Sequence, residues 1–344
     1  MDVLFWHSDE FVHVGNKYTI FVAFLNRCMT GIVYKSTGSW YTVKANDTFY
    51  KCSIKGKFRI QGIKSTNPVA VGDSVVFDVE KLGDETIGII KEINDRTNYI
   101  IRKSVKLSKQ THIIAANLDQ VFLMITLDNP PTFTLFIDRF LATCEAYDVP
   151  VVLLFNKIDT YDEAQLNEVK YLAALYRQIG YTCVGISAAT GKNVDKVKAI
   201  MQDKTSMFAG HSGVGKSTLV NSIAPNLALK TAQISQQHLQ GQHTTTFAEM
   251  YDLSFGGTII DTPGIKGFGI VDMDAAEIGD YFPEFFQLKD QCKFNNCLHL
   301  NEPNCAVKAA LEANEVAWSR YRSYEQMVTG EEDTYRTDTY GDKK

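Results

Sequence analysis

The sequence predicts a multi-domain chain in which a small all-β barrel is followed by an α/β domain and then by a small α-helical domain. Residues 30–100 carry short runs of β-branched and aromatic residues that alternate with polar ones and are separated by turn residues, as in antiparallel strands. From residue 118 near-continuous apolar runs alternate with helical patterns, which is typical of parallel strands buried on both faces. After residue 270 the strand-like runs stop, and three cysteines fall within residues 292–305.

The composition is that of an ordinary soluble globular protein. The chain has 344 residues, of which 45% are hydrophobic and 22% charged, and this length suffices for about two or three domains. The net charge of −5 does not favour a general nucleic-acid binder. No apolar run reaches the roughly 18 residues that span a bilayer, so we expect no membrane contact.

The charge is distributed unevenly along the chain. Between residues 30 and 70 the basic residues meet a single acid, Asp47, so this part can approach phosphate while the whole molecule stays acidic. The basic residues are Lys35, Lys44, Lys51, Lys55, Lys57, Arg59 and Lys64.

Residues 1–28 form an unusual start. The run YTIFVAFL resembles the apolar part of a signal peptide, but no small-residue cleavage pattern follows it. Alternatively Met29 is the true start, because strand-like sequence begins directly after it. We favour a non-native or mis-assigned extension over residues 1–28, and a genuine extension stays open.

Residues 29–100 fit an oligonucleotide-binding (OB) barrel. Five short strands with a basic face are typical of that fold, although a barrel that binds no nucleic acid stays open. Trp40, Tyr41 and Tyr50 are candidate stacking groups for RNA bases. We expect at least some of them in the core, because barrel strands bury alternate residues.

A phosphate-binding loop is predicted between a short apolar strand and a helix. Residues 210–217 match the pattern G-x-x-x-x-G-K-[ST], in which backbone N–H groups surround phosphate. Lys216 is expected to reach the β- and γ-phosphates, and the Ser217 hydroxyl to bind Mg²⁺. The residues expected to contact the nucleotide here are Gly210, His211, Ser212, Gly213, Val214, Gly215, Lys216, Ser217 and Thr218.

Two further segments fit the switch regions that respond to the γ-phosphate. In the D-T-P-G motif, Asp261 would bind Mg²⁺, usually through water, and the Gly264 N–H would contact the γ-phosphate. The segment GQHTTTFAEM supplies a switch threonine, which spacing alone does not choose. We assign Thr244 to the nucleotide and Thr245 to Mg²⁺ and catalysis.

A guanine-recognition motif precedes the phosphate loop. Asn156, Lys157 and Asp159 follow an apolar strand as N-K-I-D, and the Asp159 carboxylate can accept both the N1–H and the exocyclic amine of guanine. Adenine offers neither in that arrangement. Ser187 and Ala188 end the next strand, where a backbone N–H can meet guanine O6. The expected nucleotides are therefore GTP and GDP.

The order of these motifs is permuted. A small GTPase usually runs from the phosphate loop through the switch threonine and D-x-x-G to N-K-x-D and S-A. Here N-K-x-D and S-A come first, at residues 156 and 187, and the other three follow at 210, 244 and 261. A circular permutation is physically permissible because domain termini often lie close together.

With these motifs in this order, the chain resembles the RsgA (YjeQ/YloQ) family of circularly permuted GTPases, from Met29 onward. The resemblance implies a GTPase that acts on the 30S ribosomal subunit late in its assembly, contacts its rRNA and is stimulated by it. The expected domains are an OB barrel over 29–100, a permuted GTPase domain over 101–272 and a zinc-binding domain with an acidic tail over 273–344. The cysteine count of seven is odd, and three of the cysteines are clustered, which argues for a reducing compartment rather than a disulfide framework, so we expect a cytoplasmic protein. We also expect a monomer.

Cys292, Cys297, His299 and Cys305 offer three thiolates and one imidazole, the ligand set of one structural Zn²⁺. Their spacing departs from common C-x₂-C fingers, and buried thiols with a surface histidine are the alternative. The resemblance favours zinc, because these four residues match the family pattern. Since this region is expected to lack a long apolar core of its own, metal binding is expected to supply much of its folding free energy.

The residue that orients the attacking water is not in its usual place. Many GTPases carry glutamine directly after D-x-x-G, whereas this chain has Ile265. From the residues alone, a surface histidine at position 243 stays open. The resemblance gives His243 the family's water-orienting role, so the expected catalytic residues are His243, Lys216 and Thr245. The alternative function is a GTP-dependent RNA- or protein-binding switch with negligible turnover. An ATP-driven transporter or kinase subunit is disfavoured by N-K-I-D.

Overall fold

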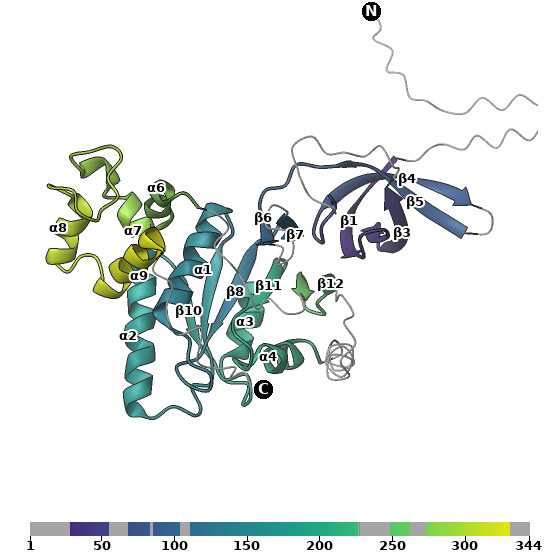
Figure 1. Cartoon of the computed structure of the whole chain (residues 1–344). Coiled ribbons are helices and arrows are strands. Elements are labelled where there is room, and N and C mark those ends of the chain that lie inside the picture. Colours follow the sequence, from purple (N-terminus) through teal and green to yellow (C-terminus); the bar gives the residue numbers. More distant parts are fainter. Residues whose placement is uncertain are drawn as a thin grey trace, which may run out of the picture.

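The computed structural model describes residues 28–54, 68–82, 85–103, 111–225, 227, 248–261 and 273–330. Three parts follow one another in space, with an α/β domain between a β-barrel and a helical module (Figure 1). The predicted multi-domain fold class is confirmed. No helix among these residues is long and apolar enough to cross a membrane.

The barrel has five strands: β1 (Cys28–Ser36), β2 (Tyr41–Ala45), β3 (Thr48–Ile54), β4 (Ser74–Leu82) and β5 (Glu85–Ile93). They pair in the order β1-β2-β3-β5-β4, and β4 pairs again with β1, which closes the barrel as in an OB fold. Tyr41 is buried in its core, Tyr50 packs against Phe77, and Trp40 is 39% exposed. Of the three candidate stacking groups, Trp40 is therefore the exposed one.

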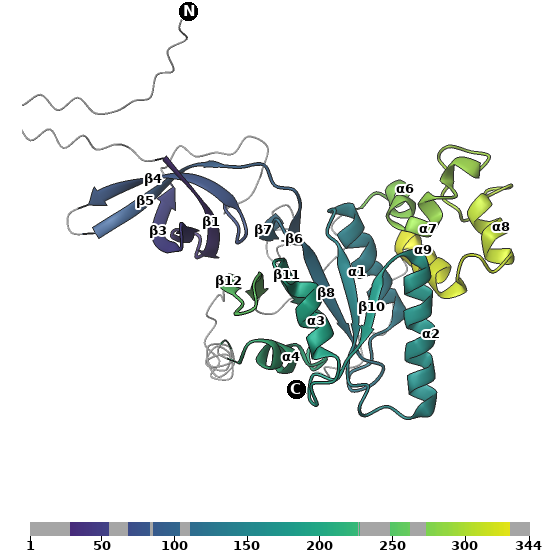
Figure 2. The same ribbon diagram turned by 180° about the vertical axis from the view of Figure 1, so that it is seen from behind.

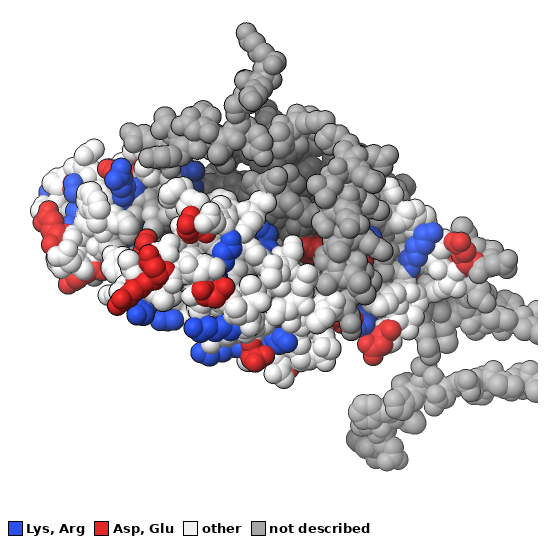
Figure 3. Space-filling view, turned by 90° about the horizontal axis from the view of Figure 1, so that it is seen from below, with Lys and Arg blue, Asp and Glu red and all other residues white. Residues whose placement is uncertain are grey.

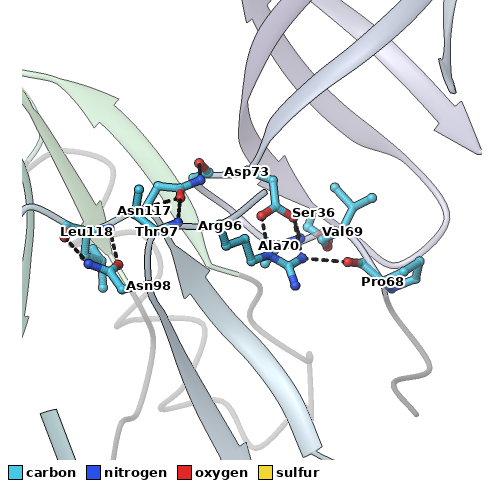
Figure 4. Close-up of polar contacts among 11 residues, drawn as sticks. Ser36, Pro68, Val69, Ala70, Asp73, Arg96, Thr97, Asn98, Asn117 and Leu118 are labelled. Atoms are coloured by element: carbon cyan, nitrogen blue, oxygen red, sulfur yellow. Dashed lines mark hydrogen bonds and ion pairs between the residues drawn. The ribbon is translucent and has the colours of Figure 1, made fainter. Parts of the chain in front are cut away.

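A polar network joins the barrel to the α/β domain (Figure 4). The Arg96 guanidinium donates to both carboxylate oxygens of Asp73, at 2.6 and 2.7 Å. The Asn117 amide donates to Gly72 O at 3.0 Å and accepts from Thr97 N at 2.9 Å. A short hairpin of β6 (Tyr99–Lys103) and β7 (Thr111–Ala116) continues from this network. These bonds fix the course of the connecting chain.

The α/β domain has a sheet with the strand order β10-β9-β8-β11-β13-β12. The strands are β8 (Gln120–Ile125), β9 (Val151–Phe155), β10 (Thr182–Gly185), β11 (Thr205–Ala209), β12 (Glu249–Asp252) and β13 (Thr258–Asp261), and only β12 runs antiparallel to its neighbour within this domain. β11, which leads into the phosphate loop, lies in the interior of the sheet although it comes late in the chain. The strand that carries the phosphate loop therefore follows β8, β9 and β10 in the chain, as the permuted motif order requires.

Helices cover both faces of this sheet (Figure 2). α1 (Thr134–Ala146) and α2 (Glu163–Ile179) bury apolar side chains in one core, including Phe140 and Tyr176. α3 (Val194–Met201) and α4 (Lys216–Ile223) pack into a second core on the opposite face, with Met201 and Leu219. The near-continuous apolar strands follow from burial on both sides.

The sheet of the α/β domain continues into the barrel, because β12 pairs with β1 at Lys35 and Glu249. Lys35 forms an ion pair with Glu249 at 3.0 Å, and Lys44 forms one with Asp252 at 2.9 Å. The Tyr34 hydroxyl also donates to Asp252, at 2.7 Å. Two lysines of the basic stretch, Lys35 and Lys44, thus form ion pairs with β12 of the GTPase domain.

The C-terminal module consists of α6 (Ala275–Ile278), η1 (Gly279–Tyr281), α7 (Pro283–Phe286), η2 (Lys289–Gln291), α8 (Ala306–Glu312) and α9 (Trp318–Thr329). It contains an apolar cluster with Phe282, Phe285, Val307 and Tyr324. The prediction that this region lacks an apolar core of its own was therefore wrong. The cluster is assembled from short, separated elements, which no single apolar run in the sequence reveals.

Candidate functional site

The phosphate loop, residues 210–217, joins β11 to α4. Gly210, Gly213 and Gly215 have φ values of 135°, 86° and 101°, which L side chains rarely adopt. A Cβ at Gly215 would lie 2.4 Å from Asn156 Nδ2, and one at Gly210 would lie 2.6 Å from Met124 O. Glycine is thus required here both by backbone conformation and by close packing against the ends of neighbouring strands.

The Lys216 side chain folds back over the phosphate loop. Its Nζ donates to Gly210 O at 2.7 Å and to His211 O at 2.6 Å, and burial lowers the pKa of Lys216. The His211 ring packs on Phe136 of α1, with the ring centroids 3.9 Å apart. Burial, together with the charge of Lys216, lowers the pKa of His211. Lys216 thus supplies a positive charge at this loop, where an anionic ligand can meet it.

Asn156 connects the three segments that were predicted to hold the nucleotide. It is 2% exposed, and its Nδ2 donates to Val214 O at 2.7 Å. Its Oδ1 accepts from Ala188 N at 2.9 Å. One buried amide therefore fixes N-K-I-D against both the phosphate loop and the S-A segment.

The remaining described residues of these motifs surround this junction. Lys157 has a positive φ of 66°, and its Nζ donates to Asn129 O. Ser187 is buried and its hydroxyl accepts from Thr190 N at 3.1 Å, which shapes the loop after β10. The exposed residues are Asp159, Ser212, Gly213, Ser217 and Thr218. Exposure leaves the Asp159 carboxylate and the Ser217 hydroxyl accessible to a ligand.

Asp261 ends β13, the strand next to β11. Burial, and then the charge of Glu249, raise the pKa of this carboxyl. Asp261, at the end of β13, and Ser217, in the first turn of α4 after the phosphate loop, both offer hard oxygen donors, which suits Mg²⁺. The other predicted switch residues, His243, Thr244, Thr245 and Gly264, lie outside the described residues.

The four predicted metal ligands come together in the C-terminal module. The ligand atoms of Cys292, Cys297, His299 and Cys305 all lie within 4.8 Å of one another. His299 Nδ1 lies 3.3 Å from the Cys305 sulfur and 3.6 Å from the Cys292 sulfur. Burial lowers the pKa of His299, which favours the neutral imidazole that binds metals. Three sulfurs and one nitrogen at this spacing fit a tetrahedral zinc ion.

Sequence reasoning missed the residues that hold this ligand loop. The Tyr321 hydroxyl donates to His299 O at 2.8 Å, and the Tyr324 hydroxyl donates to Leu298 O at 2.6 Å. The Glu302 carboxylate accepts from Leu298 N at 2.8 Å and from Leu300 N at 2.9 Å. The available signal was the i, i+3 spacing of the two tyrosines on a helical pattern.

A phosphate loop on an interior parallel strand, tied to a guanine motif that precedes it in the chain, defines a circularly permuted P-loop GTPase. Comparison with known proteins agrees. The family model described as RsgA GTPase matches residues 93–271, and the RsgA N-terminal domain matches residues 30–90. The chain belongs to the RsgA family and is a GTPase.

Relatives match over nearly the whole chain. The small ribosomal subunit biogenesis GTPase RsgA of Christiangramia forsetii is 70% identical over 91% of this chain and 99% of its own length. That of Flavobacterium johnsoniae is 64% identical over 92% and 98%.

Two solved structures share the fold. YjeQ from Thermotoga maritima has 35% identity and a TM-score of 0.71, and the match covers 88% of this chain and 98% of that one. YloQ, described as a circularly permuted GTPase, has 31% identity and a TM-score of 0.70, over 92% and 99%.

Proposed function

We propose that this protein binds the small (30S) ribosomal subunit, assists its late maturation, and hydrolyses GTP to GDP and phosphate faster when the subunit is bound. The observation that carries the nucleotide part is Asn156, which joins the guanine motif to the phosphate loop. The subunit part is supported by the relatives named above, which match at 70% and 64% identity over nearly their full length.

In this proposal each segment has its own task at the nucleotide. Asp159 reads guanine, the backbone of Ser187 and Ala188 borders the base, and the N–H groups of residues 210–218 hold the phosphates. Lys216 stabilises charge at the β- and γ-phosphates. Ser217 and Asp261 would hold Mg²⁺ together with the switch threonine Thr245, and Thr244 would contact the nucleotide. The bound magnesium would neutralise phosphate charge.

His243 is proposed to orient the attacking water, because Ile265 cannot. Thr245 would complete the magnesium site when the γ-phosphate is present, and the Gly264 N–H would sense that phosphate. We expect His243→Ala to reduce subunit-stimulated turnover while leaving GTP affinity near that of the unaltered chain. Undiminished turnover would remove His243 from the mechanism.

Cys292, Cys297, His299 and Cys305 are proposed to hold one structural Zn²⁺. Four protein ligands leave no open position for water or substrate, so the ion would serve folding rather than chemistry. The domain limits proposed from the sequence are kept: the barrel over 29–100, the GTPase domain over 101–272, and the zinc-binding domain with its acidic tail over 273–344.

The barrel is proposed to contact rRNA through exposed groups that the GTPase domain leaves accessible. Lys51 lies over the Trp40 ring, with its Nζ 4.4 Å from the centroid, so a cation and a stacking surface are adjacent. On the face seen in Figure 3, basic and acidic side chains are interspersed rather than gathered by sign. A local contact of this kind fits the acidic net charge better than a broad basic surface. A cytoplasmic monomer is proposed with it.

Multiple-turnover GTP hydrolysis with and without 30S subunits tests the proposal. We expect stimulation by 30S subunits, none by 50S subunits, and loss of turnover in Lys216→Ala. Co-sedimentation with 30S subunits in the presence of a GTP analogue, and weaker co-sedimentation with GDP, is expected as well. Binding without turnover would instead support the alternative, a GTP-dependent binding switch.

A further inference from the structure

Glu249 stands between the barrel and the aspartate assigned to magnesium. In the antiparallel pair of β12 and β13, Glu249 is the direct partner of Asp261. Side chains of directly paired residues lie on the same face of a sheet, with their Cβ atoms about 4.5–5.5 Å apart. Two carboxylates therefore face each other at the end of β13.

The charge of Glu249 is balanced from the other domain. Lys35 of the barrel is the β1 partner of Glu249, and its Nζ lies 3.0 Å from the Glu249 carboxylate. The two side chains are 42% and 31% exposed, so this pair is accessible to solvent and to ligands. The Tyr251 hydroxyl, two residues along β12, also bonds to Glu249. Lys35, Glu249 and Asp261 thus form a row across three adjacent strands.

We propose that Glu249 is a positioning residue for magnesium at Asp261, and that Lys35 of the barrel sets the effective charge of Glu249. This inference rests on the proposed magnesium site. With Lys35 in place, part of the Glu249 charge is offset, and the remainder still raises the pKa of Asp261. When Lys35 is withdrawn, the uncompensated carboxylate adds negative charge beside the cation site. An RNA phosphate that attracts Lys35 would therefore strengthen magnesium binding in the GTPase domain.

The direction in which each variant changes the Mg²⁺ affinity distinguishes this role from a merely structural one. Lys35→Gln leaves Glu249 uncompensated and should tighten Mg²⁺ binding by about three- to tenfold. Glu249→Gln leaves an uncompensated lysine and should weaken it by a similar factor. The double variant restores neutrality and should return to the value of the unaltered chain. If the pair only held the domains together, both single variants would change the affinity in the same direction.

The same interface supplies a matched control. Lys44 pairs with Asp252 at 2.9 Å, but the β13 partner of Asp252 is the neutral Thr258. Lys44→Gln removes an ion pair between the same two domains without exposing charge to Asp261. We expect it to leave Mg²⁺ affinity unchanged. Lys35→Arg keeps the charge and should behave like the unaltered chain.

The experiment titrates Mg²⁺ into the full chain, desalted without chelator and saturated with a fluorescent GDP analogue. Opposite shifts for Lys35→Gln and Glu249→Gln support the inference. Equal-sign shifts, or none, overturn it, provided that Asp261→Asn weakens Mg²⁺ binding in the same assay. If Asp261→Asn has no effect, the magnesium assignment itself is wrong and the inference falls with it. Circular dichroism of each variant confirms that the comparison is made between folded chains.

Discussion

The Arg320 guanidinium on α9 donates to the Asp138 carboxylate on α1 at 2.7 Å, and the two side chains are 1% and 0% exposed. Arg320 also donates to both carboxylate oxygens of Glu284, at 2.7 and 3.1 Å. Tyr176 of α2 donates to the same oxygen of Asp138 at 2.8 Å. One buried cation therefore ties the C-terminal module to two helices of the GTPase domain.

Arg320→Met should destabilise the chain by about 3–5 kcal/mol, because it leaves Asp138 buried without its cation. Urea unfolding of the nucleotide-free chain measures this change. The control is Lys289→Met, whose ion pair with Asp280 is about one-third exposed on both sides and should contribute at most about 1 kcal/mol. Equal effects of the two substitutions would show that the buried pair does not anchor the module.

Asp159→Asn should exchange nucleotide specificity. The amide presents one acceptor and one donor, so it loses a bond to guanine and gains one to the C2 carbonyl of xanthine. We expect GTP affinity to fall by about 100-fold and XTP affinity to rise, since a buried mismatch of this kind costs about 3 kcal/mol. Competition against a fluorescent nucleotide measures both.

Asp162→Asn is the matched control for this substitution. Asp162 caps α2 three residues further on, where its side chain accepts from Gln165 N at 2.8 Å. Asparagine caps helices about as well as aspartate, so nucleotide specificity should not change. A specificity exchange in this variant, or none in Asp159→Asn, would contradict the assignment of Asp159 to guanine.

Gly215→Ala should abolish nucleotide binding, because its Cβ would lie 2.4 Å from Asn156 Nδ2 at a φ of 101°. Gly38 has a similar φ of 86°, but a Cβ there meets nothing within 4 Å. Gly38→Ala therefore carries only the backbone strain, of about 1 kcal/mol. Isothermal titration with GDP should detect binding in Gly38→Ala and none in Gly215→Ala. Retained binding in both would mean that the loop relaxes around the added methyl group.

Residue patterns within short windows predicted the strands, helices and motifs. They could not predict which residues far apart in the sequence would pair. The barrel strands, the phosphate loop and the four cysteine and histidine ligands follow from period, spacing and residue type within short windows. Lys35 and Lys44 were read as part of a basic face for RNA, yet their partners Glu249 and Asp252 lie more than 200 positions away. Nothing near either lysine in the sequence indicates that pairing.

The C-terminal module illustrates the same limit. Its apolar cluster contains residues of α6, α7, α8 and α9 and Ala142 of α1. No continuous periodic run in the sequence therefore predicted this cluster. Arg320 and Asp138 stand 182 positions apart, and each reads alone as a surface charge. Burial of a charged side chain depends on the partner that the fold supplies, which sequence spacing does not encode.

His211 should make folding stability depend on pH below neutrality. Burial lowers its pKa in the fold, so the unfolded chain binds a proton first as the pH falls through about 6.5. Stability should therefore be full above that pH and decline below it. His211→Asn removes this titration and should flatten the curve of unfolding free energy between about pH 7.5 and 5.5. His299, whose pKa is also lowered, remains in both chains, so only the difference between the curves reports His211. Parallel curves would place His211 in solvent.

Zinc removal should loosen the C-terminal module without emptying the nucleotide site. The four ligands lie within 4.8 Å of one another, and two tyrosines and Glu302 hold their loop, so losing the ion leaves thiols and an imidazole without their shared partner. We expect one zinc per chain by metal analysis, and its loss in Cys297→Ser together with a lowered unfolding midpoint. Cys28→Ser is the control, because Cys28 is exposed and lies outside the cluster. GDP binding should persist in both variants, since Asn156 and the phosphate loop make their contacts within the GTPase domain. Full zinc content in Cys297→Ser would show that the cluster is not the metal site, because a closed tetrahedral site does not hold its ion comparably with three ligands.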